Sequence, residues 1–186
     1  MAKKKTTTKK NKEKITADKK VKDTCFTIMP FRGWFDMYYA DIYVPAVEAA
    51  DLKPTRADDL FRTSTIINDI WTMTKKAKVI LADLTGKNPN VLYELGLAHA
   101  IAKPAVLVTE NIDDVPFDLR HLRVIIYDKN EPNWGDILSG KITKAISEVL
   151  EAPEKSVLAT FLSTESTGNE IEVSPLERSY VNARGD

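Results

Sequence analysis

Short apolar runs alternate along this chain with longer segments in which apolar residues recur at helical spacing. Apolar runs of this length are typical of buried strands, and the helical spacing is typical of helices that lie against a sheet. The predicted strands are residues 25–29, 52–55, 77–84, 105–109 and 124–127. The predicted helices are residues 42–50, 66–76, 90–102 and 134–150, with an aromatic-rich loop over residues 31–39.

The strand predicted over residues 77–84 indicates how the sheet is built. Its residues Val79, Ile80 and Leu81 are consecutive and apolar, as expected for a parallel strand that is covered on both faces. Strands that alternate with helices form parallel sheets through crossover connections. The sequence therefore predicts an α/β fold, a doubly wound parallel sheet of five strands with helices on both faces.

The charges divide the 186 residues into unlike parts. Basic and acidic side chains number 27 each, yet residues 1–22 contain ten lysines against Glu13 and Asp18. Because such a segment has too few apolar residues to repay ordering, we predict a disordered basic tail (1–22), one globular domain (23–152) and a polar C-terminal extension (153–186), flexible or docked on a partner. The tail could contact nucleic acid or an acidic partner through its lysines. A solubilising role is the alternative, since no aromatic residue there could stack on bases.

Composition argues against several classes of protein. No apolar run approaches the roughly 18 residues of a membrane span, and the N-terminus lacks the apolar stretch of a signal peptide. We therefore expect a soluble, cytoplasmic protein without a membrane partner. Cys25 cannot form a disulfide within the chain, and with only His99 and His121 beside it we expect no metal site and no tightly bound cofactor.

The loops that follow the strands are the place to search for a site, because open parallel sheets bind ligands outside the carboxyl ends of their strands. Arg32 and Arg56 follow the first and second predicted strands, and Asp58 comes shortly after. Guanidinium groups match the oxygens of a phosphate. The alternative role for these arginines is an ion pair, with Asp36 or Asp59 for example.

One carboxylate stands in an otherwise apolar helix. Glu94 is the single charged residue of the helix predicted over 90–102, and a lone buried carboxylate is costly unless it is paired or used. With Asn88 or Asn90 as the cap, Glu94 lies near the positive end of the helix, where the ionised form is favoured. An ionised glutamate suits a nucleophile. The alternative is a structural carboxylate that caps a loop or pairs with an arginine, Arg56 or Arg120.

The residues around Glu94 also carry a family resemblance. The run from Asp83 to Ala100, DLTGKNPNVLYELGLAHA, preceded by IMPF at the end of the first strand, resembles the nucleoside 2-deoxyribosyltransferase-like superfamily over roughly residues 24–150. The resemblance implies a flavodoxin-like fold and a glutamate that attacks the anomeric carbon of a nucleoside or nucleotide and releases the base. It implies that Glu94 is this nucleophile and that Asp83, the second catalytic candidate, faces the base or the sugar.

The segment that contains Glu94 is also similar to TIR-like nucleotide-binding domains, in which the corresponding glutamate belongs to NAD-cleaving enzymes. We therefore expect cleavage or transfer of an N-glycosidic bond on a nucleoside or nucleotide substrate, NAD included. A TIR-like nucleotide-sensing module that acts in an assembly is the alternative, and we expect a homo-oligomer. The expected substrate-binding residues are Arg32, Arg56, Asp58, Asn88, Asn90 and Tyr93.

Overall fold

The fold is a five-stranded sheet in which every strand is parallel to its neighbours. The computed structural model describes residues 22–31, 33–57 and 66–153. The strand order is β2-β1-β3-β4-β5, which is the flavodoxin-like order, so the predicted fold class is confirmed. The strands are β1 (Thr24–Ile28), β2 (Lys53–Arg56), β3 (Val79–Asp83), β4 (Ala105–Thr109) and β5 (Val124–Ile126).

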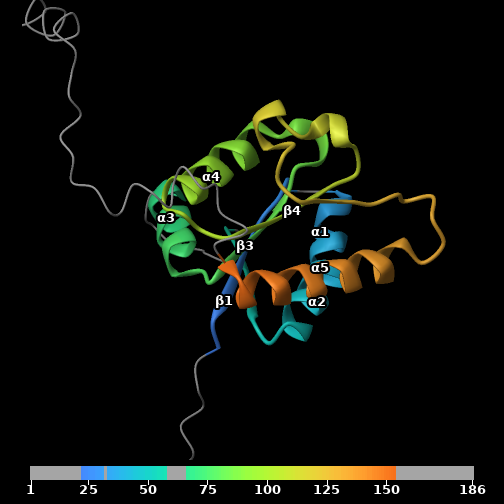
Figure 1. Ribbon diagram of the computed structural model, residues 1–186, viewed down its shortest axis with the longest axis horizontal. Coiled ribbons are helices and arrows are strands. Elements are labelled where there is room, and N and C mark those ends of the chain that lie inside the picture. The colour runs from blue at the N-terminus through green and yellow to red at the C-terminus, as the bar shows by residue number, and fades with distance from the viewer. Residues whose placement is uncertain (1–21, 32, 58–65, 154–186) are drawn as a thin grey trace, which may run out of the picture.

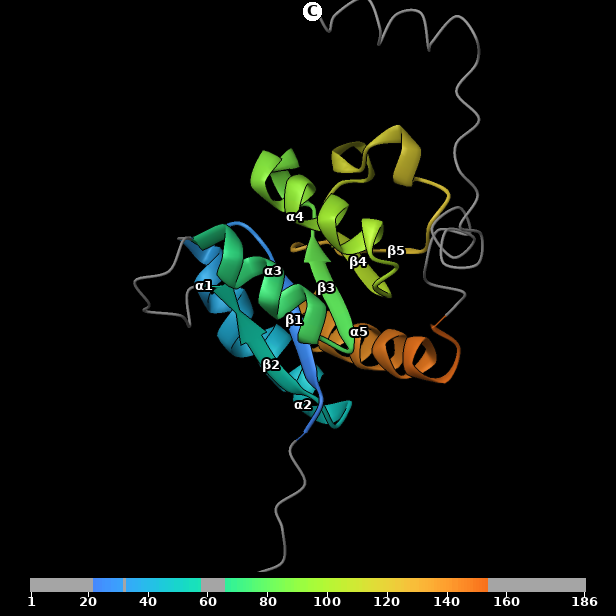
Figure 2. The same ribbon diagram turned by 90° about the vertical axis from the view of Figure 1, so that its left-hand side faces the viewer.

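Helices cover both faces of the sheet (Figure 1). One face carries α3 (Ile66–Lys76) and α4 (Pro89–Ala100), and the other carries α2 (Val44–Ala49) and α5 (Trp134–Glu151). Figure 2 shows the same layers from the side of α3, with β2, β1, β3 and β4 side by side in that order. The shorter elements are α1 (Trp34–Tyr38), the π-helix η1 (Tyr39–Tyr43) and the 3-10 turns η3 (Thr85–Lys87), η4 (Ile112–Asp114) and η5 (Phe117–Leu119).

Alternation along β3 divides the core into two halves. Val79 and Leu81 belong to the core under α5, whereas Ile80 and Ala82 belong to the core under α3 and α4. All five residues of β3 are buried. Because successive side chains of a strand point to opposite faces, Asp83 continues the first set and lies on the α5 face of the sheet.

The predicted strands and helices are all present, and their ends differ from the predicted ends by two residues at most. The prediction of a loop over residues 31–39 was wrong. The chain is helical from Trp34 onwards through α1 and η1. Phe35, Tyr38 and Tyr39 pack against the core under α5, and the Tyr38 ring meets the Trp134 ring edge-on at 5.0 Å. This long-range packing stabilises a helix that local composition did not indicate.

Several expectations fall outside the described residues. These include the basic tail (1–22) except for its last residue, the C-terminal extension beyond Pro153, and two expected substrate-binding residues, Arg32 and Asp58. The domain limits therefore stay predictions. No helix within the described ranges is long and apolar enough to cross a membrane.

Candidate active site

The candidate site lies where the order of the strands reverses. β1 stands between β2 and β3, so the connection that leaves β1 goes to one face of the sheet and the connection that leaves β3 goes to the other. Flavodoxin-like sheets bind ligands in the crevice at this point, outside the carboxyl ends of the strands. α4 follows β3 directly after η3 and contacts both β1 and β3. The first turns of α4 therefore follow the carboxyl end of β3 at this point of the sheet.

Asn88 determines where α4 begins. Its side-chain oxygen accepts hydrogen bonds from the backbone N–H groups of Asn90 at 2.9 Å and of Val91 at 3.5 Å. This is a side-chain cap, which satisfies amides that the helix itself leaves without partners. Of the two caps that the sequence allowed, Asn88 and Asn90, the structure has Asn88, and this cap places Glu94 in the second turn of the helix.

The Glu94 side chain is buried on the α4 face of the sheet. Only 8% of its surface is exposed, and the neighbouring helix positions Val91, Leu95 and Ala98 belong to the apolar core under α4. Burial disfavours the charged form of a carboxyl group. It raises the pKa of Glu94 to about 7, so both protonation states are populated at neutral pH.

Glu94 has no polar partner in the described part of the chain. No hydrogen bond or ion pair joins its carboxyl group to another described residue. The arginines that offered a structural role for Glu94 make other ion pairs. Arg56 contacts Asp36 at 3.0 Å, and Arg120 contacts Asp113 at 3.4 Å. Within these residues the carboxyl group is therefore a buried polar group that the fold itself does not use.

The protonation state of Glu94 differs from the sequence prediction. The positive end of α4 was expected to favour the ionised form, but the pKa is raised because burial outweighs that effect. The partial charge of a helix end falls off within the first turn. Glu94 lies beyond that turn, and the amides at the start of α4 already donate to Asn88.

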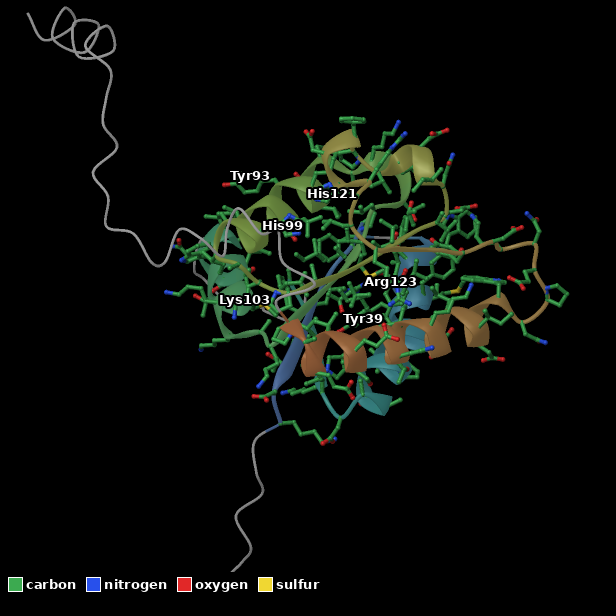
Figure 3. All side chains as sticks on the ribbon, viewed as in Figure 1. Tyr39, Tyr93, His99, Lys103, His121 and Arg123 are labelled. Carbon is green, nitrogen blue, oxygen red and sulfur yellow. The ribbon has the colours of Figure 1, made fainter. Side chains whose placement is uncertain are left out.

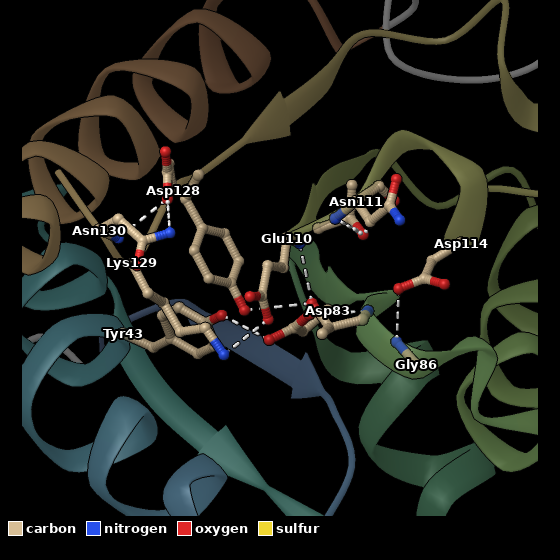
Figure 4. A network of polar contacts seen from close by, with 12 residues as sticks. Tyr43, Asp83, Gly86, Glu110, Asn111, Asp114, Asp128, Lys129 and Asn130 are labelled. Carbon is tan, nitrogen blue, oxygen red and sulfur yellow. Dashed lines mark hydrogen bonds and ion pairs between the residues drawn. The ribbon is translucent and has the colours of Figure 1, made fainter.

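Asp83 is fully buried and bonded to two elements of the fold (Figure 4). The Tyr43 hydroxyl donates to one carboxyl oxygen at 2.6 Å, and the backbone N–H of Thr85 donates to the other at 3.0 Å. Burial raises the pKa of Asp83, and the two hydrogen bonds oppose that rise. Asp83 lies on the α5 face, whereas Glu94 comes from the helix on the opposite face. The hydrogen bonds of Asp83 therefore join η1 to the turn that leads into α4.

A polar groove of about 690 Å³ opens beside this turn, at the carboxyl ends of β3, β4 and β5. The Thr85 hydroxyl oxygen lies 3.1 Å from the Tyr127 hydroxyl and accepts a hydrogen bond from the Glu110 N–H at 3.0 Å. Within the described ranges, no three His, Cys, Asp or Glu side chains gather closely enough to hold a metal ion. The groove is lined by Thr85, Gly86, Glu110, Asn111, Asp114, Ile126, Tyr127 and Asp128.

Tyr43, which donates to Asp83, and Tyr127, which contacts the Thr85 hydroxyl, were not among the predicted site residues. Tyr127 stood at the carboxyl end of a predicted strand, so the rule that singled out Asp83 could also have found it. Tyr43 stood inside a predicted helix and carried no such signal. Only the packing of η1 against the sheet brings its hydroxyl group to Asp83.

We expect Tyr43→Phe to destabilise the domain by about 1–3 kcal/mol, because it removes a donor from a buried carboxyl group. Tyr127→Phe is the matched control, with an expected loss of about 1 kcal/mol or less. The Thr85 hydroxyl that Tyr127 contacts keeps the Glu110 N–H as a partner. Urea unfolding of both variants at pH 7 measures the two losses. Equal losses would contradict a special role for the bond between Tyr43 and Asp83.

Arg56 is enclosed at the end of β2. Its side chain is 8% exposed and forms an ion pair with Asp36 at 3.0 Å. The guanidinium carbon lies 4.4 Å from the centre of the Tyr39 ring and 5.4 Å from that of Phe31. Stacking of this kind suits a guanidinium group. The ion pair with Asp36 is the alternative role that the sequence offered for this arginine.

The remaining predicted residues lie on the first turns of α4. Asn90 is exposed, and Tyr93 is 58% exposed and projects from the outer side of the helix (Figure 3). Asn88, Asn90, Tyr93 and Glu94 thus lie at the start of one helix. Arg56 and Asp83 lie at the carboxyl ends of β2 and β3, on the same side of the molecule as the start of that helix.

Comparison with known proteins finds similarity in structure alone. No protein-family model and no curated protein sequence matches the chain. A 2-desoxiribosyltransferase from Leishmania mexicana is similar in structure, with a TM-score of 0.43 and 18% identity over 69% of this chain and 98% of that one. The Vibrio vulnificus NanR protein complexed with ManNAc-6P has a TM-score of 0.41 and 13% identity over 77% of this chain and 55% of that one. Both similarities are weak.

Proposed function

We propose that the protein cleaves or transfers the N-glycosidic bond of a nucleoside or nucleotide, with Glu94 as the nucleophile. One observation carries the proposal. A carboxyl group without a described partner is buried in α4, the helix that follows β3 at the point where flavodoxin-like sheets bind ligands. Burial of such a group costs stability. A catalytic role explains why the chain tolerates that cost.

The proposed reaction proceeds in two displacements. The ionised Glu94 carboxylate attacks the anomeric carbon, and the bond from that carbon to the base nitrogen breaks, so the base leaves with the bonding electrons and takes up a proton. A water molecule or a second base then attacks the same carbon and displaces the carboxylate. The configuration of the sugar is retained, as in glycoside hydrolysis through a covalent intermediate.

The neighbouring residues have supporting roles in this proposal. Asp83 is buried, so we assign it a positioning role through the Thr85 amide and the turn that leads to α4. The exposed residues Asn90 and Tyr93 at the start of α4 are proposed to contact the sugar, together with the cap residue Asn88. A phosphate, where the substrate has one, is assigned to the arginines that follow β1 and β2, Arg32 and Arg56. Asp58 is proposed to contact the substrate away from the phosphate.

Chromatography of released free base tests the proposed reaction. The full chain is incubated with a panel of nucleosides, deoxynucleoside monophosphates and NAD, with and without an added acceptor base. We expect base release from at least one member of the panel. Release that requires the acceptor identifies a transferase, and release without it identifies a hydrolase. No release from any substrate under either condition overturns the proposal.

The dependence of rate on pH follows from the pKa of Glu94. Because the nucleophile must be ionised, kcat/KM is expected to rise about tenfold per pH unit below pH 7 and to level off above it. Initial rates between pH 5 and 9 on the best substrate of the panel measure this profile. A rate that falls as the pH rises through 7 would instead make Glu94 a proton donor.

A further inference from the structure

Among the described residues, β5 is one of the two edge strands of the sheet, and β2 is the other. In the described part of the chain, β5 pairs only with β4. β5 has three residues, and Ile126 at its end is 47% exposed. An unpaired edge strand presents backbone N–H and C=O groups that an added strand can satisfy. The edge of β5 is therefore a candidate docking surface.

The two faces of this edge differ in character. On the α5 side, Lys141 and Lys144 lie beside Arg123 along a surface hollow of about 350 Å³ that follows β5. The Arg123 and Lys144 side chains are each 76% exposed, and both approach Glu148, Lys144 at 3.9 Å. Three basic side chains there face one carboxylate, so the face stays net basic. Ile125 packs against the core under α5, so the next side chain, Ile126, points to the opposite face of the sheet. Residue 126 also lines the hollow, and its exposed side chain adds an apolar face to the basic one.

The C-terminal extension contains a segment that matches both faces. Residues 170–174 read Glu-Ile-Glu-Val-Ser, preceded by Gly168 and Asn169 and followed by Pro175. This is a strand pattern of alternating charged and apolar residues, bounded by turn residues. In a strand, both glutamates would point to one face and both apolar side chains to the other. Residues 164–177 contain four glutamates and no basic residue.

The chain leaves α5 close to this edge. Ala152 follows the last residue of α5 and lines a cavity of about 340 Å³ together with Arg123 and Ile125. The chain between Pro153 and Glu170, at about 3.4 Å per extended residue, reaches up to about 58 Å. That reach is about twice the 27 Å length of α5 itself. Residues 170–174 can therefore lie along β5 of the same chain.

We propose that residues 170–174 add a sixth strand to the sheet, at the edge of β5 in the same chain. Glu170 and Glu172 lie over Lys141 and Lys144, and the apolar side chains of the segment cover Ile126. The added strand shields an edge that otherwise invites pairing with other chains. This inference is independent of the proposed chemistry, because neither β5 nor the extension contains a residue to which that chemistry is assigned.

Hydrogen exchange on the full chain tests the strand. Alternate amides of residues 171–174, those that point to β5, are expected to exchange at least tenfold more slowly than those of residues 180–184. The paired change Glu170→Lys with Glu172→Lys abolishes the protection, and adding Lys141→Glu with Lys144→Glu restores it. Restoration separates pairing of these charges from a general effect of charge on the extension. Exchange of residues 171–174 as fast as that of 180–184 in the wild type overturns the proposal.

Cysteine cross-linking identifies the occupant of the edge. Ile126→Cys combined with Ile171→Cys or with Val173→Cys is expected to form a disulfide within one chain. On non-reducing gels it appears as a monomer band with altered migration, whereas a disulfide between chains gives a dimer band. Cys25 is fully buried and does not compete. The pair Ile126→Cys with Leu158→Cys is the control and stays reduced. A disulfide between two chains, or none with either position, overturns docking in the same chain. Removal of residues 2–21 is a further test. If it abolished the amide protection of residues 171–174, the basic tail would be the partner of this segment, and docking on β5 would be overturned.

Discussion

Replacement of Glu94 by glutamine reduces base release by at least about a thousandfold, because the amide cannot attack the anomeric carbon. The variant keeps the shape of the side chain and removes a charge that is costly to bury. We therefore expect the fold to persist and the loss to appear in kcat. Rates with the best substrate of the panel, at saturating concentration, measure it.

Two further variants make this prediction specific. Glu94→Asp keeps the carboxylate but withdraws it by about one carbon, and a displacement of that order is expected to cost roughly a hundredfold. Glu48→Gln is the matched control, since Glu48 lies exposed on α2 on the other face of the sheet. It should leave the rate within about twofold. Activity of Glu94→Gln within tenfold of the wild type would remove Glu94 from the mechanism.

The stability of the domain is expected to fall by about 3 kcal/mol through Glu94 alone as the pH rises from 4.5 to 8. The pKa of Glu94 is raised from 4.5 to about 7 in the folded state. Between these values the folded protein retains a proton that the unfolded chain has lost. The associated stability is complete below pH 4.5 and is lost as the pH rises through 7. Urea unfolding at several pH values measures it.

The comparison with Glu94→Gln isolates this contribution. Burial also raises the pKa of Asp83, which adds a slope of the same sign. Burial lowers the pKa of His99, so stability from that group is lost as the pH falls below 6.5, and its slope has the opposite sign. Both groups remain in the variant. The difference between the two proteins therefore reports Glu94, and a difference that does not change with pH would show that its carboxyl group is not desolvated.

Most of the fold could be predicted from local patterns. The consecutive apolar residues of β3 identified a strand covered on both faces, and α5 showed its buried face through residues at helical spacing, Leu138, Ile142 and Ile146 among them. The helical start at Trp34 could not be predicted in this way. Its aromatic side chains are held by Trp134, which lies far along the chain.

The candidate site was predictable in part. Glu94 was conspicuous as one charge among apolar neighbours, and Asn88 had the composition and position of a helix cap. The protonation state of Glu94 was not predictable, because desolvation depends on the depth of burial that two layers of packing produce. The ion pair between Arg56 and Asp36 was one of several that the sequence allowed.

Local patterns were enough to predict the order of strands and helices, the parallel sheet and the buried carboxylate in α4, because hydrophobic periodicity and helix caps act over a few residues. Which groups meet depended on the packing of whole elements. That packing brought Tyr43 to Asp83 on the α5 face, placed Arg56 against the rings of Phe31 and Tyr39, and left Glu94 without a described partner on the other face. Contacts between residues distant along the chain depend on how whole elements pack, and no local pattern encodes them.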